Sequence, residues 1–74
     1  MMEFKEITIN TEFIKLDSFL KLANAVSTSG HAKVVITGGD VKVNGFVCTM
    51  RGKKLRPGDK IEFEGEGFIV KDGN

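Results

Sequence analysis

Hydrophobic residues follow two different periods in the first third of this 74-residue chain. From Phe4 to Ile9, β-branched residues partly alternate with polar ones, which predicts a first strand with Ile7 and Ile9 on one face. A helical period follows, with apolar residues at Leu16, Phe19, Leu20, Ala23 and Val26. This spacing predicts a helix whose apolar stripe faces the core. Asp17 suits the positive end of the helix dipole and is expected to pair with Lys21, four residues later.

The next segment predicts a second, shorter helix that begins after the break at residues 27–30. Thr28 is the expected N-cap, because its hydroxyl can accept a hydrogen bond from a backbone N–H of the first turn. The helix should run to about Ile36. Gly38 and Gly39 end it, since one glycine can take the left-handed conformation that closes a helix. Its buried stripe is expected to be Ala32, Val35 and Ile36.

A tight hairpin is the strongest local signal of the chain. Asn44 and Gly45 stand between alternating apolar residues and predict a two-residue type I′ turn, because both positions need φ > 0. The two arms should be Val41–Val43 and Phe46–Cys48. Continued alternation is expected to turn three residues inward, namely Val41, Val43 and Val47. Lys42 and Asn44 should then face solvent or a ligand.

The last third of the chain predicts further strands separated by turns. A basic loop covers residues 50–54, and residues 56–59 form a turn with Pro57 at its second position. Strands are expected at Lys60–Glu64 and Phe68–Val70, with a turn at residues 64–67. The order of elements predicts one α+β domain over residues 1–74. Two short helices should pack on a small, mainly antiparallel curled sheet of four to five strands.

Charge is segregated along the chain, although the formal net charge is only +1. Residues 1–14 carry −2, residues 15–60 carry +6 and residues 61–74 carry −3. Ordinary solvated surfaces mix the two signs, so a basic middle segment favours an anionic partner, most simply nucleic acid. A solvated face that happens to be basic is the alternative when charge is the only observation.

The residues that most catalysis requires are sparse. His31 is the single histidine and Cys48 the single cysteine, and no carboxylates are spaced to meet in a pocket. We therefore expect no enzyme activity, no metal site, no cofactor and no small-molecule substrate, and Cys48 should be a half-buried strand residue. The sequence shows no secretory signal, lipidation motif or long apolar run, which predicts a soluble cytoplasmic protein with no membrane partner.

An anion-binding arrangement is present at the start of the second helix. Thr28 and Ser29 supply hydroxyls, and Gly30 lets a phosphate approach the exposed backbone N–H groups closely. His31 can donate a hydrogen bond to a ligand, and Lys33 follows in the same turn. A plain capped helix start is the alternative. The anion-binding interpretation gains weight if Lys15, Lys42, Asn44 and the Arg51–Arg56 loop lie on the same side of the domain.

Several short motifs in a fixed order resemble the S4 RNA-binding domain, the family of ribosomal small-subunit protein four. They are Lys15-Leu16-Asp17 with Leu20, residues 28–32, Gly39, Val41–Gly45 and Gly58-Asp59, and the resemblance covers about residues 15–62. The run from Arg51 to Asp59 is similar to the short bacterial stand-alone members. The resemblance implies the alpha-L RNA-binding motif, in which the starts of both helices and the hairpin face structured RNA.

The charge pattern, the helix-start chemistry and the resemblance together predict the positions that contact RNA. They are Lys15, Thr28, Ser29, Gly30, His31, Lys33, Lys42, Asn44, Arg51, Lys53, Lys54 and Arg56. Lys15 stands where the family usually has Arg, and Ser29 stands where Arg is common. Ser29 lacks one of the expected phosphate contacts, and Lys15 lacks bidentate geometry, since Lys acts as a point charge. Both departures weaken the expected binding of phosphate. The Arg51–Arg56 loop is the candidate that compensates.

Two functions from different classes are consistent with these patterns. The first is a non-catalytic module that binds structured RNA through a basic face, with ribosomal RNA or a ribosomal particle as a candidate partner. Because the chain has no Trp or Tyr, shape and phosphate contacts are expected to dominate over base stacking on a sheet. The second is a small β-grasp-like adaptor for proteins, which also uses a Val-Asn-Gly hairpin. Sulfur carriers of that group end in Gly-Gly, whereas this sequence ends in Gly73-Asn74.

Overall fold

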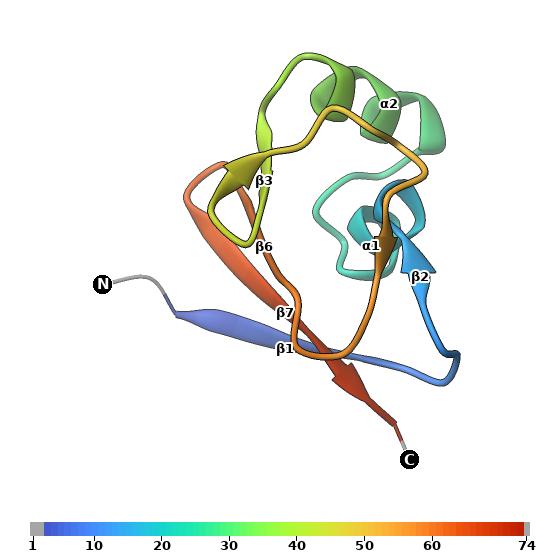
Figure 1. Ribbon diagram of the computed structural model, residues 1–74. Coiled ribbons are helices and arrows are strands. Elements are labelled where there is room, and N and C mark those ends of the chain that lie inside the picture. The colour runs from blue at the N-terminus through green and yellow to red at the C-terminus, as the bar shows by residue number, and fades with distance from the viewer. Residues whose placement is uncertain (1–2, 74) are drawn as a thin grey trace.

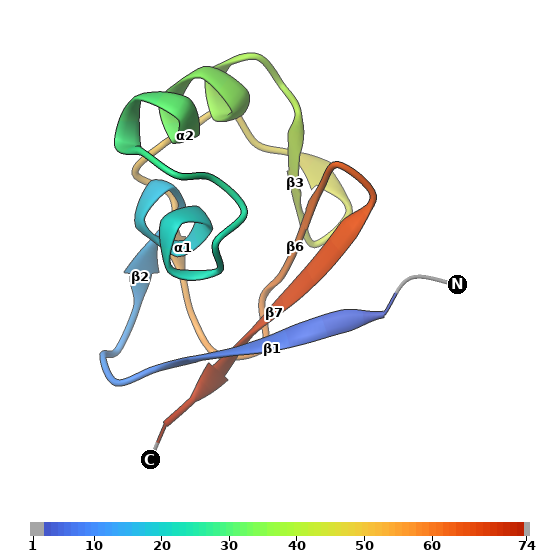
Figure 2. The ribbon, with the colours of Figure 1, turned by 180° about the vertical axis from the view of Figure 1, so that it is seen from behind.

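The computed structural model describes residues 3–73 as two helices and two sheets. Figures 1 and 2 show both helices together on one side of the curved main sheet. This arrangement confirms the predicted α+β class. The elements are β1 (Phe4–Ile9), β2 (Ile14–Lys15), α1 (Leu16–Leu22), α2 (Ser29–Thr37), β3 (Val41–Val43), β4 (Phe46–Val47), β5 (Lys54–Leu55), β6 (Lys60–Phe63) and β7 (Glu66–Asp72).

The main sheet has five strands in the order β1-β7-β6-β3-β4. Only the β1–β7 pair is parallel, and the other neighbours are antiparallel. The predicted sheet of four to five mainly antiparallel strands is therefore confirmed. A second sheet pairs β2 with β5 and was not predicted. Each of its strands has two residues, which is too short to leave a periodic pattern in the sequence.

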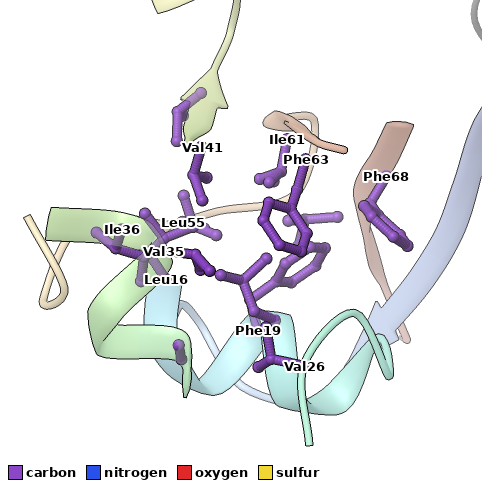
Figure 3. Close-up of a cluster of buried hydrophobic side chains, with 14 of the residues drawn as sticks. Leu16, Phe19, Val26, Val35, Ile36, Val41, Leu55, Ile61, Phe63 and Phe68 are labelled. Carbon is purple, nitrogen blue, oxygen red and sulfur yellow. The ribbon is translucent and has the colours of Figure 1, made fainter. Parts of the chain in front are cut away.

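The core lies between the helices and the main sheet. Leu16, Phe19 and Leu20 of α1 are fully buried, and Figure 3 shows Leu16 and Phe19 among the side chains of this core. The ring of Phe19 meets Phe68 of β7 edge to face, with centroids 6.2 Å apart and an interplanar angle of 82°. Aromatic pairs favour this geometry because the positive edge of one ring faces the negative face of the other. The pair joins the first helix to β7, an interior strand of the main sheet.

Helix α1 is shorter than its apolar stripe predicted. It ends at Leu22, and Asn24 takes a left-handed φ of 58° just beyond it. The backbone N–H of Asn24 donates to the carbonyl of Lys21 at 3.1 Å, and that of Ala25 donates to Leu20 at 2.9 Å. These two bonds close the helix as a Schellman motif. Val26 is still buried, but it reaches the core from the loop, so the predicted helical extent was wrong there.

Helix α2 confirms the predicted start and end. Thr28 Oγ1 accepts a hydrogen bond from the backbone N–H of His31 at 3.1 Å. At the other end Gly38 is the C-cap and Gly39 has a φ of 82°. The N–H of Asp40 then donates to the carbonyl of Val35 at 3.0 Å. Local capping chemistry alone therefore placed both ends of this helix.

The predicted hairpin turn is confirmed, because Asn44 and Gly45 have φ values of 52° and 87°. The inward orientation predicted for Val47 was wrong. Val43 pairs with Phe46 across the two-residue turn, so Val47 stands opposite Lys42 on the same face and is 57% exposed. Strand β4 ends at Val47, one residue earlier than expected, and the half-buried Cys48 beyond it packs against the core.

A second turn of the same kind lies between β6 and β7. Glu64 and Gly65 have φ values of 51° and 77°, and Phe63 pairs directly with Glu66. The turn is thus two residues long, shorter than the predicted turn at residues 64–67. Strand β7 begins earlier than the predicted strand at Phe68–Val70, because Glu66 and Gly67 pair with β6, and it ends later, because it pairs with β1 as far as Asp72.

The Gly45→Val substitution should lower the free energy of unfolding by about 1–3 kcal/mol, the range for a residue held in a strained backbone region. No heavy atom lies within 4 Å of a Cβ built at Gly45, so the cost comes from its φ and not from a clash. Gly52→Val is the matched control, since Gly52 also has open space and does not have a positive φ. Urea denaturation of both variants measures the difference. Coincident curves for Gly45→Val and the parent would contradict the turn geometry.

Candidate nucleic-acid interface

Two segments that are distant in the sequence, residues 15–17 and 51–54, lie side by side and bring four basic residues together. We call the contact between these segments the seam. Strand β2 pairs with β5 so that Lys15 stands opposite Lys54. Beyond this pair, the N–H of Leu16 donates to the carbonyl of Lys53 at 2.9 Å, and the N–H of Asp17 donates to that of Arg51 at 3.2 Å. The segment 51–54 is therefore held along the first turn of α1. We call the four residues Lys15, Arg51, Lys53 and Lys54 the basic cluster.

Burial and helix-end chemistry explain why the seam forms. Leu55 and Leu16 are both fully buried, so each strand of the small sheet is anchored to the core next to its basic residue. The first N–H groups of a helix lack partners inside the helix, and α1 has no side-chain cap at Lys15. The carbonyls of Arg51 and Lys53 satisfy two of these groups. The start of α1 therefore offers a ligand its side chains and not those two backbone N–H groups.

The basic cluster carries positive charge that its surroundings do not neutralise. All four side chains are exposed, and none forms an ion pair with any residue in the range 3–71. The ion pairs in that range join β1 to β7, through Lys5 with Glu66 and Lys71 with Glu6. Directly opposite like charges, such as Lys15 and Lys54, repel each other. A polyanion seated on the cluster would relieve this repulsion.

An aromatic ring positions one member of the basic cluster. The ammonium of Lys54 lies 4.9 Å from the centroid of the Phe13 ring. A cation over an aromatic face is attracted by about 0.5–1 kcal/mol at an exposed site. Phe13 precedes β2, so this contact fastens the Lys54 side chain to the same seam that pairs the two backbones.

The start of α2 lies beside α1 and gains a cation from it. Lys21 Nζ donates to Ser29 Oγ at 3.2 Å, and Lys21 forms no ion pair with Asp17, so that predicted pair was wrong. The carboxylate of Asp17 instead accepts from the N–H of Ser18 at 2.7 Å. Lys21 thus brings positive charge to Ser29, where the resemblance had implied the loss of an arginine. Sequence reasoning missed this residue because the contact depends on how the two helices pack.

The other predicted residues of α2 remain on its surface. Gly30, His31 and Lys33 are exposed, and a Cβ built at Gly30 would come no closer than 3.9 Å to Thr28 Oγ1. The hydroxyl of Thr28 is engaged in capping, as described above. The side chains of the first turn of α2 are therefore exposed to solvent, and Lys21 lies beside the first of them, Ser29.

Lys42 lies in surroundings of mixed charge. It stands opposite Glu62 of β6 and shares a shallow groove with Asp40 and Glu64. These carboxylates distinguish it from the basic cluster. A single continuous positive face that includes Lys42 stays a prediction.

The side chain of Asn44 serves the fold. Its Nδ2 donates to Asp59 Oδ1 at 3.1 Å, and its Oδ1 accepts from the N–H of Lys60 at 2.9 Å. Asp59 Oδ2 in turn accepts from the N–H of Arg56 at 2.9 Å, while the Arg56 side chain is exposed. The amide therefore links the hairpin to the turn at residues 56–59. Gly58 completes that turn with a φ of 99°.

The Asn44→Ala substitution should lower the free energy of unfolding by about 1–2 kcal/mol, because two side-chain hydrogen bonds are lost. Thermal and urea denaturation measure this change. RNA binding is then compared at a temperature where both proteins are folded. A stability equal to that of the parent would contradict the structural role of the amide.

Two further properties concern the whole described chain. Within residues 3–73 no group of three or more His, Cys, Asp or Glu side chains is arranged to hold a metal ion. Neither helix in that range is long and apolar enough to cross a lipid bilayer.

Comparisons with known proteins find a matching family, a similar protein and a similar structure. A family model described as an S4 domain matches residues 7–71. The chain is 44% identical over 61 residues to a probable ribosome maturation protein, RlbA, of Bacillus subtilis, and the match covers 82% of this chain and 86% of that protein. The solution structure of YbcJ from E. coli is also similar, with a TM-score of 0.71 and 28% identity. That match covers 96% of this chain and 91% of YbcJ, whose structure is described as revealing an alpha-L motif involved in RNA binding.

Proposed function

This chain belongs to the S4 domain family, and we propose that it is a non-catalytic module that binds structured RNA through the basic cluster and the adjoining start of α2. The observation that carries the proposal is the seam at which Leu16 and Asp17 bond to Lys53 and Arg51. This seam places the cations of two segments, distant in the sequence, next to each other. Family membership does not favour the β-grasp-like adaptor.

The chemistry of the cluster supports recognition of the RNA backbone. Three of its four members are lysines, which act as point charges on phosphate and carry no sequence information of their own. Lys21 with Ser29 adds a cation and a hydroxyl at the start of α2. Folded RNA presents phosphates from separate strands at short range, and a surface with cations from two segments fits that arrangement. Recognition by shape and charge is therefore the proposed mode.

The names of the similar proteins support a narrower choice of partner. RlbA is described as a probable ribosome maturation protein, and YbcJ as carrying a motif involved in RNA binding. Ribosomal RNA or a ribosomal particle is accordingly the proposed partner of this chain. A cytoplasmic location goes with that partner.

Crosslinking the tagged protein in cells and sequencing the attached RNA tests the proposal. We expect RNA well above background, enriched in ribosomal sequences. Cells that express the Lys53→Glu/Lys54→Glu variant provide the matched control and should yield less RNA. Recovery of no RNA above background from the parent protein would favour the protein adaptor.

A further inference from the structure

An open apolar groove lies between the hairpin and the basic cluster, and Lys53 is the one residue of its lining that belongs to the cluster. Its volume is about 540 Å³, within the range of about 300–1,000 Å³ for pockets that hold small organic groups. Its lining includes Val43, Phe46, Val47, Cys48, Met50 and Lys53. No Asp or Glu lines it.

Three of the lining residues expose large apolar side chains. Phe46 is 79% exposed, Met50 65% and Val47 57%. Leaving a phenylalanine in water forgoes about 1.5–3 kcal/mol relative to burying it. These three residues lie close together in the sequence, on and just after β4, at the edge of the main sheet. A cluster of this kind marks a binding surface more often than a lone exposed side chain does.

Backbone hydrogen bonds hold the segments that line the groove in place. The N–H of Cys48 donates to the carbonyl of Val41 at 2.9 Å, and the N–H of Lys53 donates to the carbonyl of Met50 at 3.2 Å. Cys48 also packs against the core. The segment that carries Met50 is thus tied to β3 at one end and to the seam at the other. A ligand would meet a surface that is already formed.

Lys53 connects the groove to the proposed RNA surface. Its side chain lines the groove, while its carbonyl accepts from Leu16 at the seam. A ligand here would therefore need an anionic group near Lys53 and a flat apolar group against Phe46. A nucleotide whose base has left the helical stack has both. Every base offers a π-face to an aromatic side chain, so this contact is tolerant of sequence.

We propose that the groove holds one unpaired base of the bound RNA, stacked on Phe46, with its phosphate near Lys53. This inference rests on the proposed function and deepens it. The proposed surface otherwise contacts only the RNA backbone, and the groove would add a contact that selects unpaired nucleotides. Sequence-specific recognition of RNA depends on unstacked bases of this kind. The aromatic residue stands at the edge of the sheet, so this is a single-base site and not a stacking platform.

Fluorescence titration with two RNA hairpins tests the inference. One hairpin carries a single unpaired 2-aminopurine bulge, and the other has the same stem with that nucleotide paired. We expect the parent protein to prefer the bulged hairpin and to change the 2-aminopurine emission. Phe46→Ala should weaken binding to the bulged hairpin by about 5- to 150-fold, the range for one base–aromatic stack, and leave the paired hairpin unaffected. The salt slope should not change, since Phe46 is uncharged.

Three further variants separate stacking from other effects. Phe46→Tyr should keep the preference for the bulge, whereas Phe46→Leu, which is apolar without a π-face, should lose it. Val34→Ala is the matched control, because Val34 is an exposed apolar residue on α2, at 66% exposure. Melting curves of all variants should match that of the parent, since the replaced side chains are exposed.

Each other outcome has a definite meaning. Equal binding of the bulged hairpin by Phe46→Ala and the parent, or full binding by Phe46→Leu, would overturn the base site and leave the RNA-binding proposal intact. A parent protein that binds neither hairpin at low salt would overturn the proposed function itself. An RNA-free dimer in sedimentation that Phe46→Ala abolishes would assign the groove to a second copy of the chain and overturn the base site.

Discussion

Changing Lys53 and Lys54 together to Glu is expected to weaken binding to structured RNA by about 10- to 30-fold at near-physiological salt, and to flatten the plot of log affinity against log salt by about one to two units of slope. Each phosphate contact releases condensed counterions and contributes roughly 0.7 to 0.9 to that slope. Two such contacts are removed. A glutamate at position 54 would also stand opposite Lys15 and neutralise the positive charge that Lys15 otherwise offers to the RNA.

Folding should change little in this double variant. Both side chains are exposed, and the main loss is the contact of Lys54 with the ring of Phe13. That loss is offset because the repulsion between Lys15 and Lys54 is removed as well. Circular dichroism melts should therefore lie close to those of the parent.

The Lys5→Glu/Lys71→Glu variant is the matched control, since it changes the net charge by the same amount on β1 and β7. It breaks two exposed ion pairs, each of which contributes at most about 1 kcal/mol. Its RNA affinity should fall far less than that of the Lys53→Glu/Lys54→Glu variant. Equal losses in the two variants would show that net charge alone controls binding, and an unchanged slope in the first would exclude the segment 51–54 from the interface.

Leu55→Ala is expected to lower the free energy of unfolding by about 2–5 kcal/mol, the range for a fully buried leucine truncated in a core. Leu55 is 0% exposed and pairs with Ile14, so its side chain anchors the strand that carries Lys54. Urea denaturation measures the loss. RNA affinity should also fall at a temperature where the variant remains folded, because the segment 51–54 is held less firmly against α1.

Leu22→Ala provides the comparison for this variant. Leu22 is 51% exposed at the end of α1, so the same change of side chain should cost about 1 kcal/mol or less. A similar loss of stability at both positions would contradict the anchoring role of Leu55. Retention of full RNA affinity by folded Leu55→Ala would show that the seam does not need to be rigid for binding.

Local chemistry in the sequence determined the parts of the fold that depend on neighbouring residues. Thr28 and Gly39 placed the ends of α2, and Asn44-Gly45 placed the hairpin turn, because capping hydrogen bonds and positive φ values are properties of a few adjacent residues. The orientation of Val47 also depends on neighbouring residues, but it was predicted wrongly. The prediction continued the inward–outward alternation through the two-residue turn, whereas the pairing of Val43 with Phe46 places these two residues on one face and Val47 on the other.

Hydrophobic periodicity set the faces of the elements but not all of their limits. The stripe that ends at Val26 overran α1, since a loop residue can enter the core as well as a helical one. The parallel pairing of β1 with β7 joins opposite ends of the chain, so no short-range pattern could indicate it. It extends β7 beyond the strand that periodicity predicted.

The sequence by itself identified the basic segment and the turn chemistry of this protein, and it indicated the four residues of the basic cluster as RNA-binding, but not Lys21 or Phe46. Only the tertiary structure brought Lys15 beside Lys54, bonded Leu16 to Lys53, and set Lys21 against Ser29. It also opened the groove beside Phe46. The pairing of Lys15 with Lys54 and the bond from Leu16 to Lys53 join segments that are distant in sequence. They form because burying Leu16 and Leu55 in one core compensates for the entropy lost in closing the intervening chain.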